Sequence, residues 1–288
     1  MTRGSLFLLA IPLAFAACSG DAFTSPDDGG SDTAVDAPVG DASTDARPDA
    51  PPPVDGSTGD AIAVDAGWQP PPPLVCAQAP ADAVFCANFD NSTNAAQDWT
   101  ATFTPSGTIT SDTVISYSPG RSAKAVANAG STTYAELYEQ VVPAAHSHIV
   151  FSFAFRVTGT DTTAKVRIAE LEYVAASGPF GKVDFGVILG SGTGVTLTIS
   201  TPTPSVTEYN LGNYKVGTWH HVSLDVKVVS PVKVDANFDG SKQSFSPVCP
   251  AADTVSYKTR DIYVGARGVT TTASVATLNF DDVLLRAF

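Results

Sequence analysis

The sequence contains 288 residues and carries a formal net charge of −13, which is concentrated near its N-terminus. Residues 19–73 hold eleven aspartates and one basic residue, Arg47, whereas residues 74–288 hold eighteen acidic and fourteen basic residues. Neither part has the excess of basic residues that displaces counterions from a nucleic acid, so we exclude nucleic-acid partners.

Residues 1–18 have the features of an export signal. The apolar run from Leu6 to Phe15 is too short to cross a bilayer, and two alanines precede Cys18. This segment resembles a bacterial lipoprotein signal, in which the cysteine is acylated and becomes the mature N-terminus. The resemblance implies a lipid anchor on Cys18 and a surface-exposed place at the outer membrane, because Ser19 stands where inner-membrane lipoproteins typically carry aspartate. Cleavage after Ala14-Phe15-Ala16, which would give a secreted protein, is the alternative.

Residues 19–73 form a low-complexity segment in which Asp-Ala pairs recur and prolines cluster at 51–53 and 70–73. Such a segment cannot bury enough apolar surface to offset the ordering of its backbone, and its aspartates repel one another. We therefore expect a disordered stalk, which as a flexible coil would span roughly 40 Å. The stalk would carry one folded domain, residues 74–288.

Four cysteines in an exported chain predict a disulfide bond. If Cys18 carries lipid, Cys76, Cys86 and Cys249 remain, and an odd number gives one bridge and one free thiol. Cys76 and Cys86 are nearest in sequence and are the pair that we predict. Pairing of Cys249 with either of them stays open, because sequence does not fix connectivity.

The folded part shows the period-two alternation of half-buried antiparallel strands. In one run, Phe151, Phe153, Phe155 and Val157 share a face. Residues 134–142 fit a helical period almost as well as alternation, and we interpret them as a strand. A chain of this length with many short strands and Gly, Pro, Asn and Asp turns predicts an all-β jelly-roll sandwich of two antiparallel sheets.

One motif supports this fold class. The run Gly217-Thr218-Trp219-His220-His221-Val222, followed by Phe238-Asp239-Gly240, resembles the W-H-H-V…D-G signature of laminin G-like domains, which have the concanavalin A-like lectin/glucanase fold. Residues 84–90 and 278–285 resemble the first and last strands of such sandwiches, which are neighbours in one sheet. The resemblance implies that Trp219 is buried between the sheets and that the two histidines have a packing role.

Two carboxylates, Glu170 and Glu172, are spaced to share one face of a strand. Laminarinase-like relatives of this fold carry a similar motif, Glu-x-Asp-x-x-Glu, for glycoside hydrolysis. Here the third acidic position is Ala175, so the acid/base is missing and we do not expect catalysis.

The same strand predicts a polar ligand-binding face, with a plain solvated face as the alternative. We expect this face to comprise Arg156, Lys165, Arg167, Glu170 and Glu172. Arg167 and Glu170 differ in parity, so a β-bulge near Ala169 would be needed to bring them to one side.

Asp90, Asp281 and Asp282 lie in or at the ends of strands that we expect to be adjacent. Oxygen clusters of this kind suit Ca²⁺, so we predict a structural calcium site there, with capping of turns and strand ends as the alternative. No other cofactor is expected.

These features together indicate a surface-displayed binding or adhesion module whose partner is a glycan or another envelope component, with carbohydrate the expected ligand class. A glycan-cleaving enzyme of the same fold, either a glycoside hydrolase or a polysaccharide lyase, is one alternative. A structural envelope protein without a small ligand is the other.

Overall fold

The structure is a computed structural model, and the chain divides into two units, Met1–Ala61 and Ile62–Phe288. All described residues belong to the second unit. They are residues 68–90, 93–128, 133–141, 148–159, 165–175, 182–190, 192–200, 206–227, 232–248, 257–268 and 276–288.

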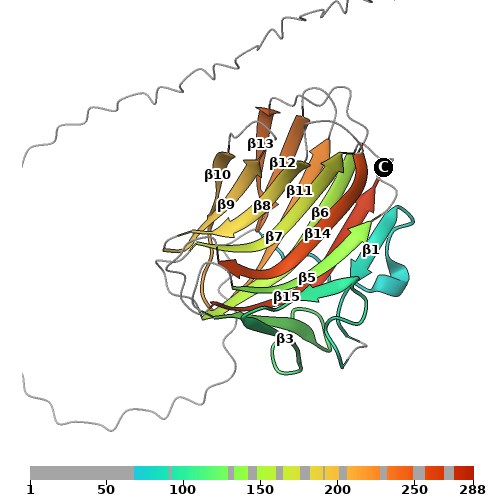
Figure 1. Cartoon of the computed structure of the whole chain (residues 1–288), viewed down its shortest axis with the longest axis vertical. Helices are drawn as coiled ribbons and strands as arrows, with labels where there is room; N and C mark the ends of the chain where they lie inside the picture. Colours follow the sequence, from blue (N-terminus) through green and yellow to red (C-terminus); the bar gives the residue numbers. More distant parts are fainter. Residues whose placement is uncertain are drawn as a thin grey trace, which may run out of the picture. The chain divides into compact units, whose positions relative to one another are not determined.

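The described residues form two antiparallel sheets (Figure 1) and one short 3₁₀ turn, η1 (Cys76–Gln78). The eight-stranded sheet has the order β13 (Ser241–Val248), β12 (Val232–Phe238), β11 (Trp219–Lys227), β6 (His148–Gly159), β15 (Ala276–Ala287), β4 (Ser122–Ala127) and β3 (Gly107–Asp112), with β1 (Ala83–Ala87) also paired to β15. The seven-stranded sheet has the order β10 (Val206–Asn213), β9 (Gly194–Ser200), β8 (Lys182–Leu189), β7 (Val166–Ala175), β14 (Tyr257–Gly268), β5 (Tyr134–Val141) and β2 (Ala101–Phe103). The predicted all-β sandwich of two antiparallel sheets is confirmed.

Alternating side chains build one core between the sheets. On β6, Phe151, Phe153 and Phe155 are fully buried, as their shared parity predicted. Leu171 of β7 and Phe185 of β8 enter the same core from the seven-stranded sheet. Each sheet therefore has an apolar inner face and an outer face that is free to carry polar groups.

Two further predictions about the strands are confirmed. Residues 134–141 are strand β5 rather than a helix. The first and last strands are neighbours, since β1 pairs with β15 through Phe85–Leu285 and Ala87–Val283.

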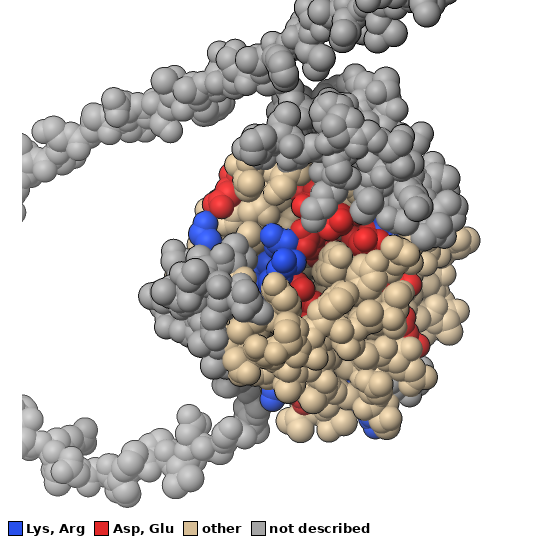
Figure 2. Space-filling model, viewed as in Figure 1, with Lys and Arg blue, Asp and Glu red and all other residues tan. Residues whose placement is uncertain are grey.

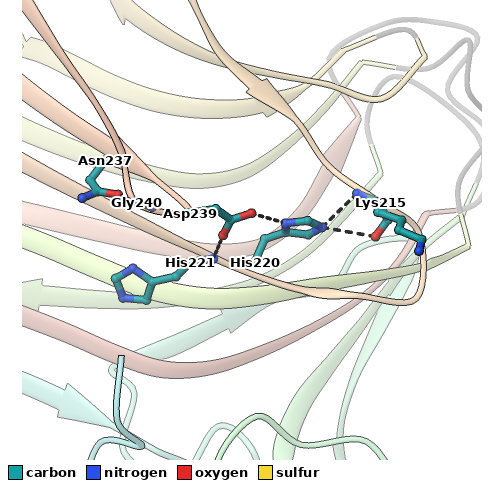
Figure 3. Close-up of polar contacts among 6 residues, drawn as sticks. All are labelled: Lys215, His220, His221, Asn237, Asp239 and Gly240. Carbon is teal, nitrogen blue, oxygen red and sulfur yellow. Dashed lines mark hydrogen bonds and ion pairs between the residues drawn. The ribbon is translucent and has the colours of Figure 1, made fainter. Parts of the chain in front are cut away.

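The W-H-H-V…D-G motif forms β11 and the hairpin turn between β12 and β13 (Figure 3). Asp239 and Gly240 both have positive φ, 47° and 84°, which is typical of a tight type I′ turn. Asp239 reaches β11 from this turn: its Oδ2 accepts a hydrogen bond from His220 Nδ1 (2.5 Å), and its Oδ1 accepts one from the backbone N–H of His221 (2.8 Å). His220 Nε2 in turn accepts the backbone N–H of Lys215 (2.9 Å).

The expectation that Trp219 is buried between the sheets is wrong. The core positions of β11 are His220, Val222, Leu224 and Val226, so the odd-numbered residues point outward. Trp219 is half-buried on the outer face of the eight-stranded sheet, edge-on to the ring of Tyr117 at 5.7 Å between ring centres. His220 takes the inner position and stacks on Phe238.

Several residues that precede β1 contact the sandwich. The hydroxyl of Tyr117 donates a hydrogen bond to the carbonyl of Pro71 (2.7 Å), and the side chain of Trp68 lies against Gly240. Cys76 and Cys86 form a disulfide bond that ties η1 to β1. Trp68 and Pro71, which lie within the residues that we assigned to the stalk, thus contact the sandwich. Cys18, Cys249 and residues 19–67 lie outside the described residues.

Candidate functional site

A β-bulge in β7 brings Arg167 and Glu170 to the outer face of the seven-stranded sheet. The pairing of β7 with β8 shifts register between Arg167 and Ala169, and Val166 and Ile168 before the shift face the core, as do Leu171 and Tyr173 after it. This change of parity is the one that we expected from a β-bulge near Ala169. Arg167 and Glu170 consequently form an ion pair, with Nη1 and Oε2 2.5 Å apart.

Polar side chains from four adjacent strands share this outer face, which we call the polar face. It comprises Glu136, Tyr138 and Gln140 of β5; Asp261, Tyr263 and Arg267 of β14; Arg167, Glu170 and Glu172 of β7; and Asp184 of β8. Cross-strand pairs fix their positions, including Tyr138–Tyr263, Tyr263–Glu170 and Glu172–Asp184. In Figure 2, basic and acidic side chains lie side by side in the middle of the visible face, in the region of β7 and β14 in Figure 1.

Glu170 is the most deeply buried acid of this face, with 2% of its surface exposed. Its Oε2 pairs with Arg167, and Arg267 Nη1 lies 4.0 Å away. Gly186 on β8, which pairs with Glu170, leaves room for Thr198, since a Cβ there would stand 2.7 Å from Thr198 Oγ1. The other carboxylate oxygen, Oε1, is buried and has no hydrogen-bond partner among the described residues.

Glu136 is a second buried acid, and it lies opposite Gly265 of β14. Burial raises the pKa of Glu136 to about 7; Arg267 opposes this rise, and the charge of Glu170 adds to it. At neutral pH this carboxyl group is therefore near its midpoint and can both donate and accept hydrogen bonds.

Tyr138 and Tyr263 form an aromatic pair on the polar face, with ring centres 5.1 Å apart and planes inclined by 38°. Burial raises the pKa of Tyr138 to about 12, and the charges of Asp261 and Glu172 add to the rise. The pKa of Tyr263 is raised further, by burial first and then by Glu172 and Asp261. Both phenols are neutral at physiological pH and offer a half-buried apolar surface with a polar tip.

Glu170, Glu172 and Asp184 bring one carboxylate oxygen each to within 4.8 Å of one another. Among the described residues, this is the only group of three or more histidine, cysteine, aspartate or glutamate side chains with that geometry. The three groups come from the neighbouring strands β7 and β8.

Of the five residues predicted from sequence for the ligand-binding face, Arg167, Glu170 and Glu172 thus meet on one face, and Arg156 does not join them. Arg156 lies on β6 in the eight-stranded sheet, where its Nε donates a hydrogen bond to the carbonyl of Gly217 (2.7 Å). Grouping Arg156 with the polar face was wrong, because alternation tells which side of a strand a residue takes but not which sheet contains the strand. Lys165 pairs with Glu208 of β10 in the seven-stranded sheet.

The polar face also contains residues that we did not select from sequence, namely Glu136, Tyr138, Gln140, Asp184, Asp261, Tyr263 and Arg267. Their alternation with buried Leu137, Ile262 and Val264 is visible in the sequence and could have marked them as outward-facing. What the sequence does not show is the pairing of β5 and β7 on either side of β14.

The predicted calcium residues gather where β15 meets the segment before β4. The pairing of β15 with β6 shifts register between Asp281 and Leu284, and Asp282 has a φ of 50°. Asp281 Oδ2 accepts hydrogen bonds from the backbone N–H of Tyr117 (2.9 Å) and Ser118 (3.1 Å). Asp282 Oδ2 accepts the backbone N–H of Leu74 (2.8 Å).

Asp90 is the more distant member of this set. Its Oδ1 lies 3.5 Å from Ser118 Oγ, a hydroxyl that also reaches Asp281 Oδ2 at 3.2 Å. Burial, and then the neighbouring charge of Asp282, raises the pKa of Asp281 to about 8. Asp282 Oδ1 is buried and has no hydrogen-bond partner in the described part of the chain. The three carboxylates therefore converge, but they do not reach the mutual spacing that Glu170, Glu172 and Asp184 show.

No family model matches the sequence, and no curated protein matches it. Among solved structures, the chain is similar to an endo-beta-1,4-glucuronan lyase from the fungus Trichoderma reesei, with 14% sequence identity over 72% of this chain and 96% of that chain and a TM-score of 0.56. The fold is a concanavalin A-like jelly roll. At this identity the likeness shows the fold alone.

Two other solved structures align less well. An alginate lyase, vAL-1, from a Chlorella virus is 14% identical over 62% of this chain and 89% of that chain, with a TM-score of 0.48. A cellulose-induced protein, Cip1, is 13% identical over 67% and 89%, with a TM-score of 0.47. In the described part of this jelly-roll chain, no helix is long and apolar enough to cross a membrane.

Proposed function

We propose that the polar face of the jelly roll binds a glycan and that the protein is a non-catalytic binding module. The observation that carries this proposal is the Tyr138–Tyr263 pair, set among Gln140, Asp261 and Glu172 on one outer sheet face. Ligand sites combine apolar and aromatic surface with a few placed polar groups. A sugar ring offers the complement, since its C–H faces pack on aromatic rings and its hydroxyl groups pair with carboxylates and amides.

The charge of the polar face favours an uncharged glycan. Five carboxyl groups share the face with two guanidinium groups, and the acids are Glu136, Glu170, Glu172, Asp184 and Asp261. A polyuronate would meet a net repulsion there. Hydroxyl groups of a neutral polysaccharide would instead donate hydrogen bonds to the carboxylates.

The same electrostatics disfavour cleavage. Chain scission by elimination needs an accessible base near neutral pH. The raised pKa values of Tyr138 and Tyr263 keep both phenols protonated, and Glu136, whose pKa is about 7, is buried. Hydrolysis needs an accessible pair of carboxyl groups, whereas Glu170 is buried and ion-paired with Arg167. These features support binding over catalysis.

A glycan array probed with the full chain tests the proposal. We expect reproducible signals from uncharged oligosaccharides, at least tenfold weaker for Tyr138→Ala. Trp219→Ala is the matched control, because it removes a half-buried aromatic ring from the outer face of the other sheet. An array without signals, or equal loss in both variants, would reject a glycan site on the polar face. New reducing ends or unsaturated products after incubation with a bound glycan would instead identify an enzyme.

We also propose that the domain is displayed from the outer membrane through an acylated Cys18, which rests on the lipoprotein-type signal alone. The wild-type protein should partition with membranes, and Cys18→Ala should release it. Mass spectrometry of the mature N-terminus decides the matter: an unmodified terminus at Ala17 would indicate plain secretion.

A further inference from the structure

Three carboxylates meet in the middle of the polar face, with one oxygen of each within 4.8 Å of the others. Glu170 and Glu172 come from β7, and Asp184 is the cross-strand partner of Glu172 on β8. Carboxylates this close repel one another unless solvent or a cation separates them. Arg167 and Arg267 both approach Glu170 through the same oxygen, Oε2.

The spacing of the three oxygens fits one calcium ion. Ca²⁺ binds oxygen ligands at about 2.3–2.6 Å, so two ligands on opposite sides of the ion stand roughly 4.6–5.2 Å apart. The oxygens of Glu170, Glu172 and Asp184 all lie within 4.8 Å of one another, inside that limit. Mg²⁺ needs shorter bonds of about 2.0–2.1 Å and a stricter octahedral arrangement, so the spacing suits Ca²⁺ better.

Glu170 supplies an independent sign of a missing ligand. Its side chain is 98% buried, and Oε1 has no hydrogen-bond partner among the described residues. A buried, unpartnered carboxylate oxygen is costly, because burial removes its hydration without replacing it. With Oε2 held by Arg167, the carboxylate is fixed in orientation and Oε1 remains available to a cation.

We propose that Glu170, Glu172 and Asp184 bind one Ca²⁺ on the polar face and that the ion takes its outer ligands from glycan hydroxyl groups. Ca²⁺ needs six to eight oxygens, and three carboxylates leave positions for water or for a pair of neighbouring sugar hydroxyls. The half-buried Glu172 and Asp184 leave the cluster accessible from the outer side. The metal site stands on its own geometry, whereas the role of the ion in recognition rests on the proposed function.

Calorimetric titration of the calcium-free full chain with CaCl₂ tests the site directly, without any glycan. The double variant Glu172→Gln/Asp184→Asn should lose one equivalent of bound Ca²⁺ per chain. The matched control, Glu208→Gln/Asp235→Asn, removes the same two charges from exposed positions and should keep that equivalent. Asp282→Asn separates this site from the aspartates of β15. If Asp282→Asn loses bound Ca²⁺ while Glu172→Gln/Asp184→Asn keeps all of it, the ion belongs to β15 and the proposal is overturned.

A second variant controls for the possibility that the double variant fails to fold. Glu172→Gln alone changes one half-buried side chain and should weaken Ca²⁺ binding at least tenfold at an unchanged melting temperature without calcium. A wild-type chain that binds no Ca²⁺, or variants that bind it as the wild type does, would overturn the site.

The glycan array then tests the role of the ion. Signals from the wild type in CaCl₂ should disappear in Glu172→Gln/Asp184→Asn and persist in the control pair. Glycan signals that persist in the double variant would overturn the role of the ion and leave the glycan site standing. Calcium binding without any glycan signal would reject the proposed function and leave the metal site intact.

Discussion

Adjacent residues on β11 have opposite environments. His220 lies inside the sandwich, where Asp239 and the Lys215 amide satisfy both ring nitrogens (Figure 3). The ring of Phe238 stacks on it. A buried imidazole with both nitrogens bonded avoids the cost of an unsatisfied polar group. Trp219 lies outside, where Tyr117 is its aromatic partner among the described residues.

The contribution of Trp219 to stability should therefore be modest. We expect Trp219→Ala to lower the free energy of unfolding by about 1 kcal/mol, the usual cost of a change outside the core. Leu224→Ala, on the core side of the same strand, should cost about 2–5 kcal/mol because it leaves a cavity. Urea denaturation of both variants measures the difference. A larger loss for Trp219→Ala than for Leu224→Ala would contradict the orientation of β11.

Glu136 should make stability depend on pH in a defined direction. Its native pKa of about 7 exceeds the ordinary value of 4.5, so the folded state holds a proton that the unfolded state releases between these values. Stability is thus lost as pH rises from about 4.5 to 7, and integrating the shift gives roughly 3 kcal/mol above pH 7.

The variant Glu136→Gln keeps the shape of the side chain and removes this titration. Relative to wild type, we expect it to gain up to about 3 kcal/mol at pH 8 and almost nothing at pH 4.5, measured by denaturant unfolding. Glu208→Gln, at an exposed site, is the control and should show no such trend. A constant difference between Glu136→Gln and wild type at both pH values would show that Glu136 titrates normally.

At the scale of single elements, the disulfide bond joins η1 to the start of the first strand. It closes a loop of ten residues in sequence separation, and loop-closure entropy assigns about 2–3 kcal/mol to such a link. The double variant Cys76→Ala/Cys86→Ala should lose this much stability. If Cys18 is acylated, the wild-type protein should also show one reactive thiol, Cys249, with a thiol reagent under denaturing, non-reducing conditions. Zero or three thiols would contradict the pairing.

The predicted calcium site lies at the register shift in β15. Its strongest support is Asp282 Oδ1, which is buried and has no hydrogen-bond partner among the described residues. We propose that Ca²⁺ binds there with Asp90 and Asp281 as neighbours. The chelator EDTA should then lower the melting temperature, and added Ca²⁺ should restore it by mass action. Asp282→Asn should reduce that recovery, whereas Glu172→Gln/Asp184→Asn should preserve it. An unchanged melting temperature in EDTA would reject a stabilising ion.

Strand β7 shows what sequence can and cannot predict for this chain. The mismatch in parity between Ile168 and Leu171 is enough to predict the bulge, and with it the shared face of Arg167 and Glu170. Local alternation likewise predicts the strands themselves. The partners of each strand depend on contacts far apart in sequence, so neither the inclusion of Tyr263 nor the exclusion of Arg156 could be read locally.

Trp219 gives a different lesson. Alternation along β11 favours the even positions as the inner ones, because Val222, Leu224 and Val226 are apolar, so the wrong expectation for Trp219 came from the W-H-H-V resemblance and not from the pattern. The structure assigns the inner side to His220 since Asp239 and Lys215 supply its hydrogen bonds. Those partners come from other segments, and their positions are not contained in the pattern of β11.

At the scale of the whole domain, the two sheets share the core but differ in their outer faces. The described core draws apolar side chains from both sheets, whereas the polar face belongs to the seven-stranded sheet alone. Glu172 of β7 and Asp184 of β8 therefore lie on strands whose opposite face packs in the core through residues such as Leu171 and Phe185. A site built on packed strands keeps its geometry when a ligand is absent.

The place of β15 has a consequence for the order in which the protein is made. Residues 276–287 lie between β6 and β4 and also pair with β1, so they join strands from both sides of the eight-stranded sheet. A growing polypeptide that has not reached residue 276 lacks this junction, and its early strands have no partner with which to complete the sheet. Such long-range closure comes late and slowly. We therefore expect the eight-stranded sheet to be completed only after nearly the whole chain has been synthesised.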